Sequence, residues 1–308
     1  MSLAKPIKLN FFCIGVQKAG TTLLHDILKQ HSNIFLPEEK EAHFFDVNEF
    51  YAKGLDYFLK TYYKSYSGEK VIGNINPNLQ VEFRSIDRII DSFGKDIKVI
   101  LILRDPVKRA YSHYLMSKKR GYENLDFNEA IKSEDNRIKN SIVHKDYESG
   151  EIAHFEKNHL GYISRGIYAP IIEYLFSQFD TKNIKVYIFE EFVKNKEKTI
   201  KDILEFLGVE YQRLDLNLKS NPAQRAKSHK LSKFLNTHST FKSALKSIIP
   251  KFIRQPIKAF ANQKNLSEIN KNVNSIPYNY QRIRSTYFEE DIRKTEQLLG
   301  RRIEVWHK

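Results

Sequence analysis

The sequence predicts an α/β fold in which helices flank a central parallel sheet. Apolar runs rich in β-branched residues, typical of buried parallel strands, occur at 71–77, 97–103 and 184–189, and an earlier apolar run ends at Gly15. Amphipathic helical patterns separate these runs. Strands that alternate with helices form a parallel sheet covered on both faces, and ligands bind at the carboxyl ends of its strands.

The remaining elements continue this alternation. A short strand or turn is expected at 34–37, after the first helix. Gly94 suits the C-terminal end of a helix, and Pro106 suits the first turn of another. The spacing of apolar residues predicts helices at 23–28, 51–62, 83–93, 106–114, 161–179 and 200–207.

The length and hydrophobic content suit one large domain. The chain has 308 residues, of which 41% are hydrophobic, so a sizeable core can form. We expect a single α/β domain over 1–308. Within it, a polar, lysine-rich segment at about 209–280 precedes a terminal helix at about 283–299.

A loop with two glycines joins the first strand to the first helix, and its composition is typical of an anion site. The loop carries Gly15, Lys18, Gly20, Thr21 and Thr22. Glycines let the backbone approach an anion closely, and N–H groups at the start of a helix carry partial positive charge. The stretch predicts a P-loop-like nucleotide-binding fold, with an ordinary strand-to-helix turn as the alternative.

The position of the lysine separates this loop from the loop that binds nucleoside triphosphates. That motif, G-x-x-x-x-G-K-[ST], matches Gly15 and Gly20, but Thr21 stands where the motif has its lysine. The lysine of this chain lies three residues earlier, at Lys18, where it is poorly placed to reach a γ-phosphate. The loop therefore favours a phosphate-like ligand one phosphorus atom shorter, and it counts against an ordinary kinase or ATPase.

Arg104 and Ser112 form a second candidate anion site. Arg104 follows the strand at 97–103, and Ser112 lies two turns into the next helix. An arginine supplies charge and a serine supplies a hydroxyl donor, so together they can bracket one phosphate. A local salt bridge to the neighbouring Asp105 is the alternative for the arginine.

Glu41 and His43 are candidate bases. They follow the anion loop after one helix and a turn, at a distance that lets the chain return over the site. If this segment is extended, Glu41 and His43 share one face, while Ala42 and Phe44 share the other. Either side chain can take a proton from an acceptor hydroxyl. The alternatives are a solvated Glu/Lys cluster and a half-buried structural histidine.

The charge balance favours an anionic partner. The chain has 51 Lys and Arg against 37 Asp and Glu, a net charge of +14 at pH 7. The lysines are spread along the chain rather than interleaved with aromatic residues, so we expect no nucleic-acid partner. A basic, apolar segment at 242–258 contains Pro250; we interpret it as a surface helix and do not expect membrane contact.

The single cysteine, Cys13, lies in the first apolar strand and is expected in the core. It can form neither an internal disulfide nor a cysteine-based metal site, and no clear cluster of metal ligands is present, so we expect no metal. The N-terminus enters the first strand almost directly, and no apolar run is long enough to cross a bilayer. These features predict a cytoplasmic location.

Three motifs resemble the sulfotransferases that use 3′-phosphoadenosine 5′-phosphosulfate (PAPS), in particular the carbohydrate-acting branch of heparan sulfate type and bacterial members. The resemblance covers most of residues 8–210 and returns at 280–306. Of the three motifs given below, the first and the third occurring together are specific for this family. The motifs are Gly15-x-x-Lys18-x-Gly20-Thr21-Thr22, Glu41-Ala42-His43-Phe44-Phe45, and Arg104-Asp105-Pro106-x-x-Arg109-Ala110-x-Ser112-His113-Tyr114.

The resemblance implies a role for each motif. Glu41 occupies the position of the catalytic base, with Lys18 stabilising the leaving phosphate and His43 as a second candidate base. Arg225, in a late basic loop, would close over the nucleotide. The donor-binding residues that the resemblance implies are Lys18, Ala19, Gly20, Thr21, Thr22, Arg104, Ser112 and Arg225.

The implied reaction is transfer of a sulfuryl group from PAPS to a hydroxyl or amine of an acceptor, with the desulfated nucleotide PAP as product. The expected acceptor is a carbohydrate or glycoconjugate. Ile75 stands where glycan-acting relatives often carry a lysine, which counts against a highly acidic acceptor. Two alternatives stay open: a P-loop phosphotransferase or nucleotide kinase, and a non-catalytic protein that binds a nucleotide or an acidic surface.

Overall fold

The centre of the fold is a five-stranded sheet whose strands all run parallel, as the sequence predicts. The computed structural model describes residues 7–139, 155–218, 224–226, 266–268 and 278–307. The strand order is β2-β3-β1-β4-β5. The strands are β1 (Phe11–Gly15), β2 (Ile34–Phe35), β3 (Val71–Ile75), β4 (Lys98–Leu103) and β5 (Ile184–Ile188).

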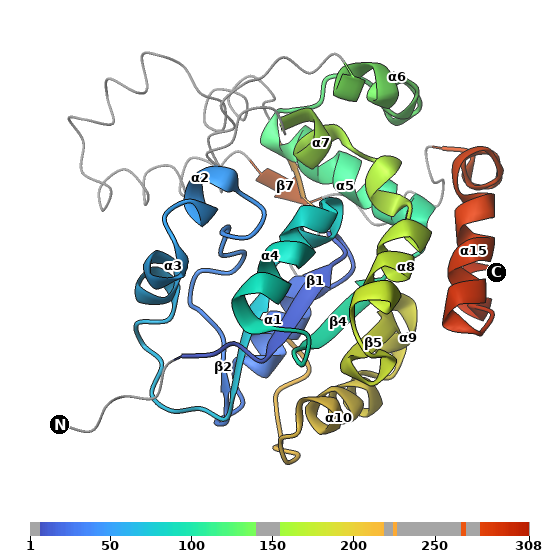
Figure 1. The fold of residues 1–308 in the computed structure, drawn as a ribbon. Coiled ribbons are helices and arrows are strands. Elements are labelled where there is room, and N and C mark those ends of the chain that lie inside the picture. The colour runs from blue at the N-terminus through green and yellow to red at the C-terminus, as the bar shows by residue number, and fades with distance from the viewer. Residues whose placement is uncertain (1–6, 140–154, 219–223, 227–265, 269–277, 308) are drawn as a thin grey trace.

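Helices cover both faces of the sheet. Right-handed crossovers from β1 to β2 and from β3 to β4 run in opposite directions along the sheet, so their helices lie on opposite faces. Figure 1 shows α4 and α8 in front of the strands and α1 behind them. The helices are α1 (Thr21–Leu28), α2 (Asn48–Tyr51), α3 (Leu55–Tyr62), α4 (Phe83–Phe93), α5 (Pro106–Arg120), α6 (Phe127–Lys139), α7 (Phe155–Leu160), α8 (Ala169–Gln178), α9 (Phe189–Lys194), α10 (Lys196–Leu207), α14 (Tyr280–Ile283) and α15 (Glu289–Leu299).

The core consists of the inner strands and the apolar stripes of the flanking helices. All five residues of β1 and of β3 are buried, as expected for strands covered on both faces. On α4 the buried side chains of Ile86, Ile89 and Phe93 recur at helical spacing. Cys13 is buried and free, in agreement with the sequence prediction.

Two predicted helices differ from the observed ones. The aromatic pattern at 51–62 is divided between α2 and α3, because Gly54 has a φ of +82° and interrupts the helix. The helix predicted at 161–179 begins only at Ala169; a 3-10 turn at Ser164–Gly166 precedes it, and Pro170 occupies its first turn. A proline fixes the start of a helix more strongly than the upstream apolar residues do.

The C-terminal segment braces the end of β4. The Asp291 carboxylate accepts hydrogen bonds from the backbone N–H groups of Tyr168 and Ala169, at 2.7 and 3.0 Å, and so caps α8. The Tyr280 hydroxyl donates to the buried carboxylate of Asp105, directly after β4, at 2.5 Å. A helix predicted at 283–299 is present as a π-helical turn at Arg284–Phe288 followed by α15.

A short antiparallel pair, β6 (Gln224–Ala226) and β7 (Leu266–Glu268), lies in the lysine-rich segment. The basic segment at 242–258 is outside the described residues. Among the helices that the structure describes, none combines the length and the apolar character needed to cross a membrane.

Gly73 gives a test of the core. It pairs with Phe11 on β1, and a Cβ atom at position 73 would lie 1.9 Å from the Phe11 ring. We expect Gly73→Ala to lower the free energy of unfolding by about 1–3 kcal/mol, measured by urea denaturation, because it overpacks the core. Phe11→Leu should relieve the clash, so the double variant should be more stable than the sum of the two single changes predicts. Strict additivity would contradict this account.

Candidate functional site

The loop after β1 has the backbone of an anion cradle. Gly20 has a φ of +85°, and a Cβ there would lie 2.8 Å from the Phe189 ring, so only glycine fits. Lys18 has a φ of +75°, which is rare for a residue with a side chain. The helix α1 begins directly afterwards, at Thr21, and the N–H groups of its first turn have no acceptor within the helix.

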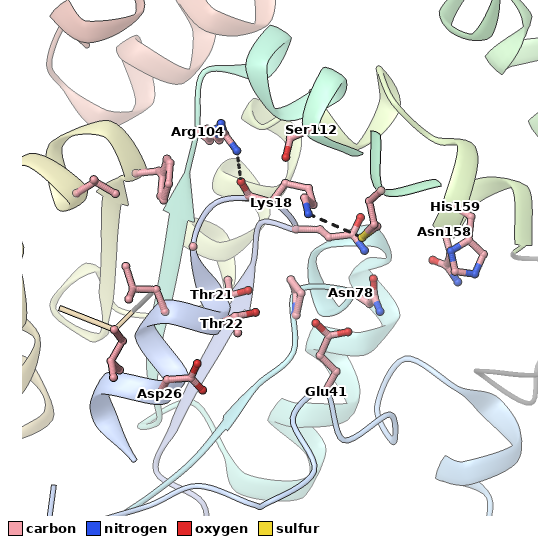
Figure 2. Close-up of a pocket in the computed structure, with 18 of the residues that line it drawn as sticks. Lys18, Thr21, Thr22, Asp26, Glu41, Asn78, Arg104, Ser112, Asn158 and His159 are labelled. Carbon is pink, nitrogen blue, oxygen red and sulfur yellow. Dashed lines mark hydrogen bonds between the residues drawn. The ribbon is translucent and has the colours of Figure 1, made fainter. Parts of the chain in front are cut away.

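The loop opens into a pocket of about 630 Å³ at the carboxyl ends of the strands (Figure 2). This volume is typical of small-molecule and cofactor sites. The pocket brings together most of the residues predicted from the sequence, although they lie far apart in the chain. Those that line it are Lys18, Gly20, Thr21, Thr22, Glu41, His43, Arg104 and Ser112.

Two positive charges in the pocket have no carboxylate partner among the residues that the structure describes. Within the described residues, neither Lys18 nor Arg104 forms an ion pair, and the polar contact of the Lys18 ammonium is the Met116 sulfur at 3.9 Å. Burial, followed by the nearby charges of Arg104 and Arg120, lowers the pKa of Lys18 to about 8. A bound anion would relieve this repulsion, so the arrangement favours an anionic ligand.

Arg104 is fixed to the loop. Its Nη1 donates to the Lys18 carbonyl oxygen at 2.8 Å, a bond drawn in Figure 2, and its guanidinium lies 4.9 Å from the centre of the Phe189 ring. The Tyr168 hydroxyl donates to the Arg104 carbonyl oxygen at 2.8 Å. Ser112, on α5, faces the same pocket. The two predicted anion sites therefore belong to one pocket, close enough for a single ligand to contact both.

Glu41 lies on the side of the pocket away from Arg104 (Figure 2). Burial disfavours its ionisation, but Lys40, at 2.9 Å, together with the charges of His43 and Arg120, outweighs burial and lowers the pKa of Glu41. Glu41 is therefore ionised at neutral pH and able to accept a proton. Its φ is +66°, so the segment is not extended as assumed. Glu41 and His43 nevertheless both line the pocket, while Ala42 and Phe44 are buried.

His43 is oriented by a hydrogen-bonded chain. Its Nδ1 lies 2.6 Å from an Asp46 carboxylate oxygen, and the Asn76 amide donates to the other oxygen at 3.1 Å. Such a chain fixes the orientation of the ring. The choice of base between Glu41 and His43 stays open, because both side chains line the pocket.

The structure does not place two of the predicted donor-binding residues in the pocket, one because it is buried and one because its side chain is not described. Ala19 is fully buried, and its N–H donates to the Val16 carbonyl at 3.1 Å, so it supports the loop rather than facing a ligand. Arg225 lies in β6, and its side chain is outside the described part of the structure. No group of three or more potential metal ligands occurs within the described residues.

The pocket also contains residues that the sequence did not reveal. Asn78 follows β3 and Phe189 follows β5; the rule that sites lie at the carboxyl ends of parallel strands could have found them. Asn158 and His159 come from α7, in a polar stretch that carries no motif. The unpredicted lining residues are Gln17, Leu23, Asp26, Pro77, Asn78, Met116, Arg120, Asn158, His159, Phe189, Val193, Lys196 and Leu218.

Comparison with known proteins identifies the family. The family model described as "Sulfotransferase domain" matches residues 9–273, so the chain belongs to the sulfotransferase family. A crystal structure of a sulfotransferase from Alicyclobacillus acidocaldarius has the same fold, with a TM-score of 0.65 and 22% identity over 98% of this chain and 100% of that one.

Curated relatives are similar over shorter segments. The membrane-associated sulfotransferase kil1 of Dictyostelium discoideum is 36% identical over 35% of this chain and 23% of its own length. Human heparan sulfate glucosamine 3-O-sulfotransferase 3B1 is 26% identical over 64% of this chain and 45% of its own. The mouse 3-O-sulfotransferase 5 is 35% identical over 33% of this chain and 28% of its own. The matches thus span less than half of these relatives.

The lowered pKa of Lys18 predicts pH-dependent anion binding. Lys18 loses its charge as pH rises through about 8, so affinity for inorganic sulfate should fall between about pH 7 and 9. Isothermal titration calorimetry measures this, because sulfate itself does not titrate in that range. Lys18→Arg, which keeps its charge at high pH, should flatten the profile. An equally steep decline in Lys18→Met would assign the effect to another group.

Proposed function

We propose that this protein is a sulfotransferase that moves a sulfuryl group from PAPS to a hydroxyl or amine of an acceptor, and that the acceptor is a glycan or glycoconjugate. The observation that carries the proposal is the pairing of Lys18 and Arg104, which form no ion pair with any described residue, with the ionised Glu41 across one pocket. A cationic half suits a bisphosphorylated donor, and a carboxylate opposite it suits a base.

The residues present fit PAPS. Lys18, Thr21, Thr22 and the N–H groups at the start of α1 would hold the 5′-phosphosulfate. Arg104 and Ser112, farther along the pocket, would hold the 3′-phosphate by charge and hydroxyl donation. The hydrogen bond between Arg104 and the Lys18 carbonyl sets the separation of these two groups. PAPS, when bound, supplies the sulfuryl group.

Two side chains of the protein take part in the proposed transfer step. In the proposed step the acceptor atom forms a bond to sulfur while the bond from sulfur to the 5′-phosphate oxygen breaks. Glu41 takes the proton that the acceptor loses. Lys18, already desolvated, stabilises the negative charge that develops on the departing phosphate oxygen, and preorganised donors are effective in this role.

The acceptor proposal rests on the similarity to the relatives and on one position, residue 75, at which this chain differs from glycan-acting sulfotransferases. Two of the relatives named above are heparan sulfate sulfotransferases, which favours a glycan. Ile75 is buried in β3, so no cation is available at that position to bind an acidic group. These two points together favour a glycan of low charge.

The rival functions make different demands on the loop. A P-loop phosphotransferase needs a lysine at position 21, and the Thr21 side chain cannot replace its charge. A non-catalytic nucleotide-binding protein would use the cationic half of the pocket but would have no need of Glu41. Measurements of ligand binding distinguish the phosphotransferase from the proposed enzyme, and measurements of turnover distinguish the non-catalytic protein from it.

The donor assignment predicts selective binding of PAP. We expect PAP to raise the melting temperature by several degrees in a thermal-shift assay, because a ligand that binds only the folded state stabilises it. ATP with magnesium should have a much smaller effect. Arg104→Ala should abolish the PAP shift, whereas Arg302→Ala, at an exposed arginine, should retain it. A shift with ATP and magnesium that exceeds the PAP shift would favour the phosphotransferase.

The catalytic assignment predicts separate losses for two variants. With radiolabelled PAPS and a glucosamine disaccharide as acceptor probe, Lys18→Ala should reduce kcat by about two to three powers of ten, because it removes a preorganised cation. Glu41→Gln should reduce kcat by a similar factor of about 10²–10⁴ while PAP still binds. Lys201→Ala, at an exposed lysine on α10, is the control. Undiminished turnover in Glu41→Gln would transfer the role of base to His43.

A further inference from the structure

A buried arginine joins two asparagines that line the pocket beside Glu41. Arg165, in the turn before α8, is 3% exposed. Its Nη2 donates to the Asn78 amide oxygen at 2.6 Å, and its Nη1 lies 3.4 Å from the Asn158 amide oxygen and 3.2 Å from the Asn158 carbonyl. Asn78 follows β3 and Asn158 belongs to α7, so Arg165 fixes two separate elements to each other.

The chemistry of the guanidinium fixes the direction of both amides. A guanidinium carries only donors, so each asparagine must turn its amide oxygen toward Arg165. The two NH₂ groups then remain as donors, and both side chains line the pocket. Within the described residues, the NH₂ groups of Asn78 and Asn158 have no hydrogen-bond acceptor. An arginine that itself does not line the pocket thus sets which polar atoms the pocket offers.

These donors belong to the half of the pocket where an acceptor would enter. Figure 2 shows Glu41, Asn78 and Asn158 on the side away from Arg104. Burial and the charge of Arg109 lower the pKa of Arg165 to about 9, while the charges of Glu41 and Asp46 oppose this shift. Arg165 therefore lies within electrostatic reach of the proposed base.

We propose that Asn78 and Asn158, held by the positioning residue Arg165, recognise the acceptor, and that the acceptor group is a hydroxyl of an uncharged polyhydroxylated molecule. This inference rests on the proposed sulfuryl transfer. A hydroxyl has one proton and two lone pairs. It can give the proton to Glu41, accept a hydrogen bond from an asparagine NH₂ group, and attack sulfur with the second lone pair.

Other acceptor groups fit this arrangement poorly. An ammonium group has no lone pair, and a neutral amine has one, which an N–H donor would occupy instead of leaving it for sulfur. The two asparagines offer a sulfate or carboxylate only neutral donors, and the cations Lys40 and Arg120 already interact with the Glu41 carboxylate. Neutral amide donors and one carboxylate together match a neutral sugar with neighbouring hydroxyls.

The position of the transferred group gives the first test. The glucosamine disaccharide with free amines carries both kinds of nucleophile on one scaffold. We expect tandem mass spectrometry of the product to show an O-sulfate. An N-sulfate as the main product would overturn the proposal. So would protein that binds PAP but, when supplied with PAPS, neither binds nor sulfates the disaccharide, although the donor assignment would then stand.

Variants of the three residues give the second test. Asn78→Ala, Asn158→Ala and Arg165→Met should each raise the KM for the disaccharide by about 3- to 10-fold, the loss of one net hydrogen bond. The kcat and the Kd for PAP should change by less than about twofold, which a general loss of structure would not give. Arg165→Lys keeps the positive charge but loses the planar pair of guanidinium donors. Its KM for the disaccharide should lie between the KM of Arg165→Met and that of the unaltered protein.

The matched control is Asn183→Ala. Asn183 is a buried asparagine that donates to the Lys95 carbonyl at 3.4 Å, near the start of β5 and at the opposite end of the strands. Its KM for the disaccharide should stay unchanged. An unchanged KM in both Asn78→Ala and Asn158→Ala would overturn the proposal, and so would a parallel loss of PAP affinity. The Asn78→Ala and Asn158→Ala variants carry the test if Arg165→Met does not fold. Failure of the unaltered protein to bind PAP would instead reject the proposed donor.

Discussion

Positive charge at the carboxyl edge of the sheet, with no carboxylate partner among the described residues, is the constraint on which the site depends. Burial lowers the pKa of Lys18, and repulsion by the Arg104 charge lowers it in the same direction. The fold opposes this repulsion with direct bonds: Arg104 donates to the Lys18 carbonyl and stacks on Phe189. The C-terminal segment adds support through Tyr280 and the carboxylate of Asp105. The pocket is thereby prepared for an anion before one binds.

Backbone strain is concentrated at the same place. Among the described residues, Lys18 and Glu41 are the non-glycine residues with positive φ, and both line the pocket. A left-handed conformation costs a residue with a side chain about 1–2 kcal/mol, so packing elsewhere must hold both in place. The buried strand β1 leads into the loop of Lys18, and β3 and β4 pair with it on either side. The two side chains assigned to the reaction are therefore the ones whose backbone the fold constrains most.

The pocket has two halves of different chemistry. Cationic side chains characterise one half, and asparagine amides characterise the other. On the donor side, neither Lys18 nor Arg104 forms an ion pair within the part of the chain that the structure describes. On the other side, Arg165 donates hydrogen bonds to the amide oxygens of Asn78 and Asn158, and the neutral NH₂ groups of these asparagines remain as donors in the half of the pocket that contains Glu41. Arg109, although part of the third motif, contacts neither half; it is buried and donates to the Gly161 and Tyr162 carbonyls. A residue of a sequence motif can thus have a structural role, while asparagines outside every motif, Asn78 and Asn158, line the site.

The sequence by itself determined the sheet, the anion loop and the residues that line the cationic half. Buried strands such as β4 and the Gly15–Thr22 loop are local patterns, and the parallel topology then places their ends at one edge. The cytoplasmic location and the single-domain organisation stay predictions. Only the tertiary structure decided that Ala19 faces inward, that Glu41 turns through a positive φ, and that Asn78, Asn158 and Arg165 meet. These features depend on contacts between segments far apart in the chain, which no local pattern encodes.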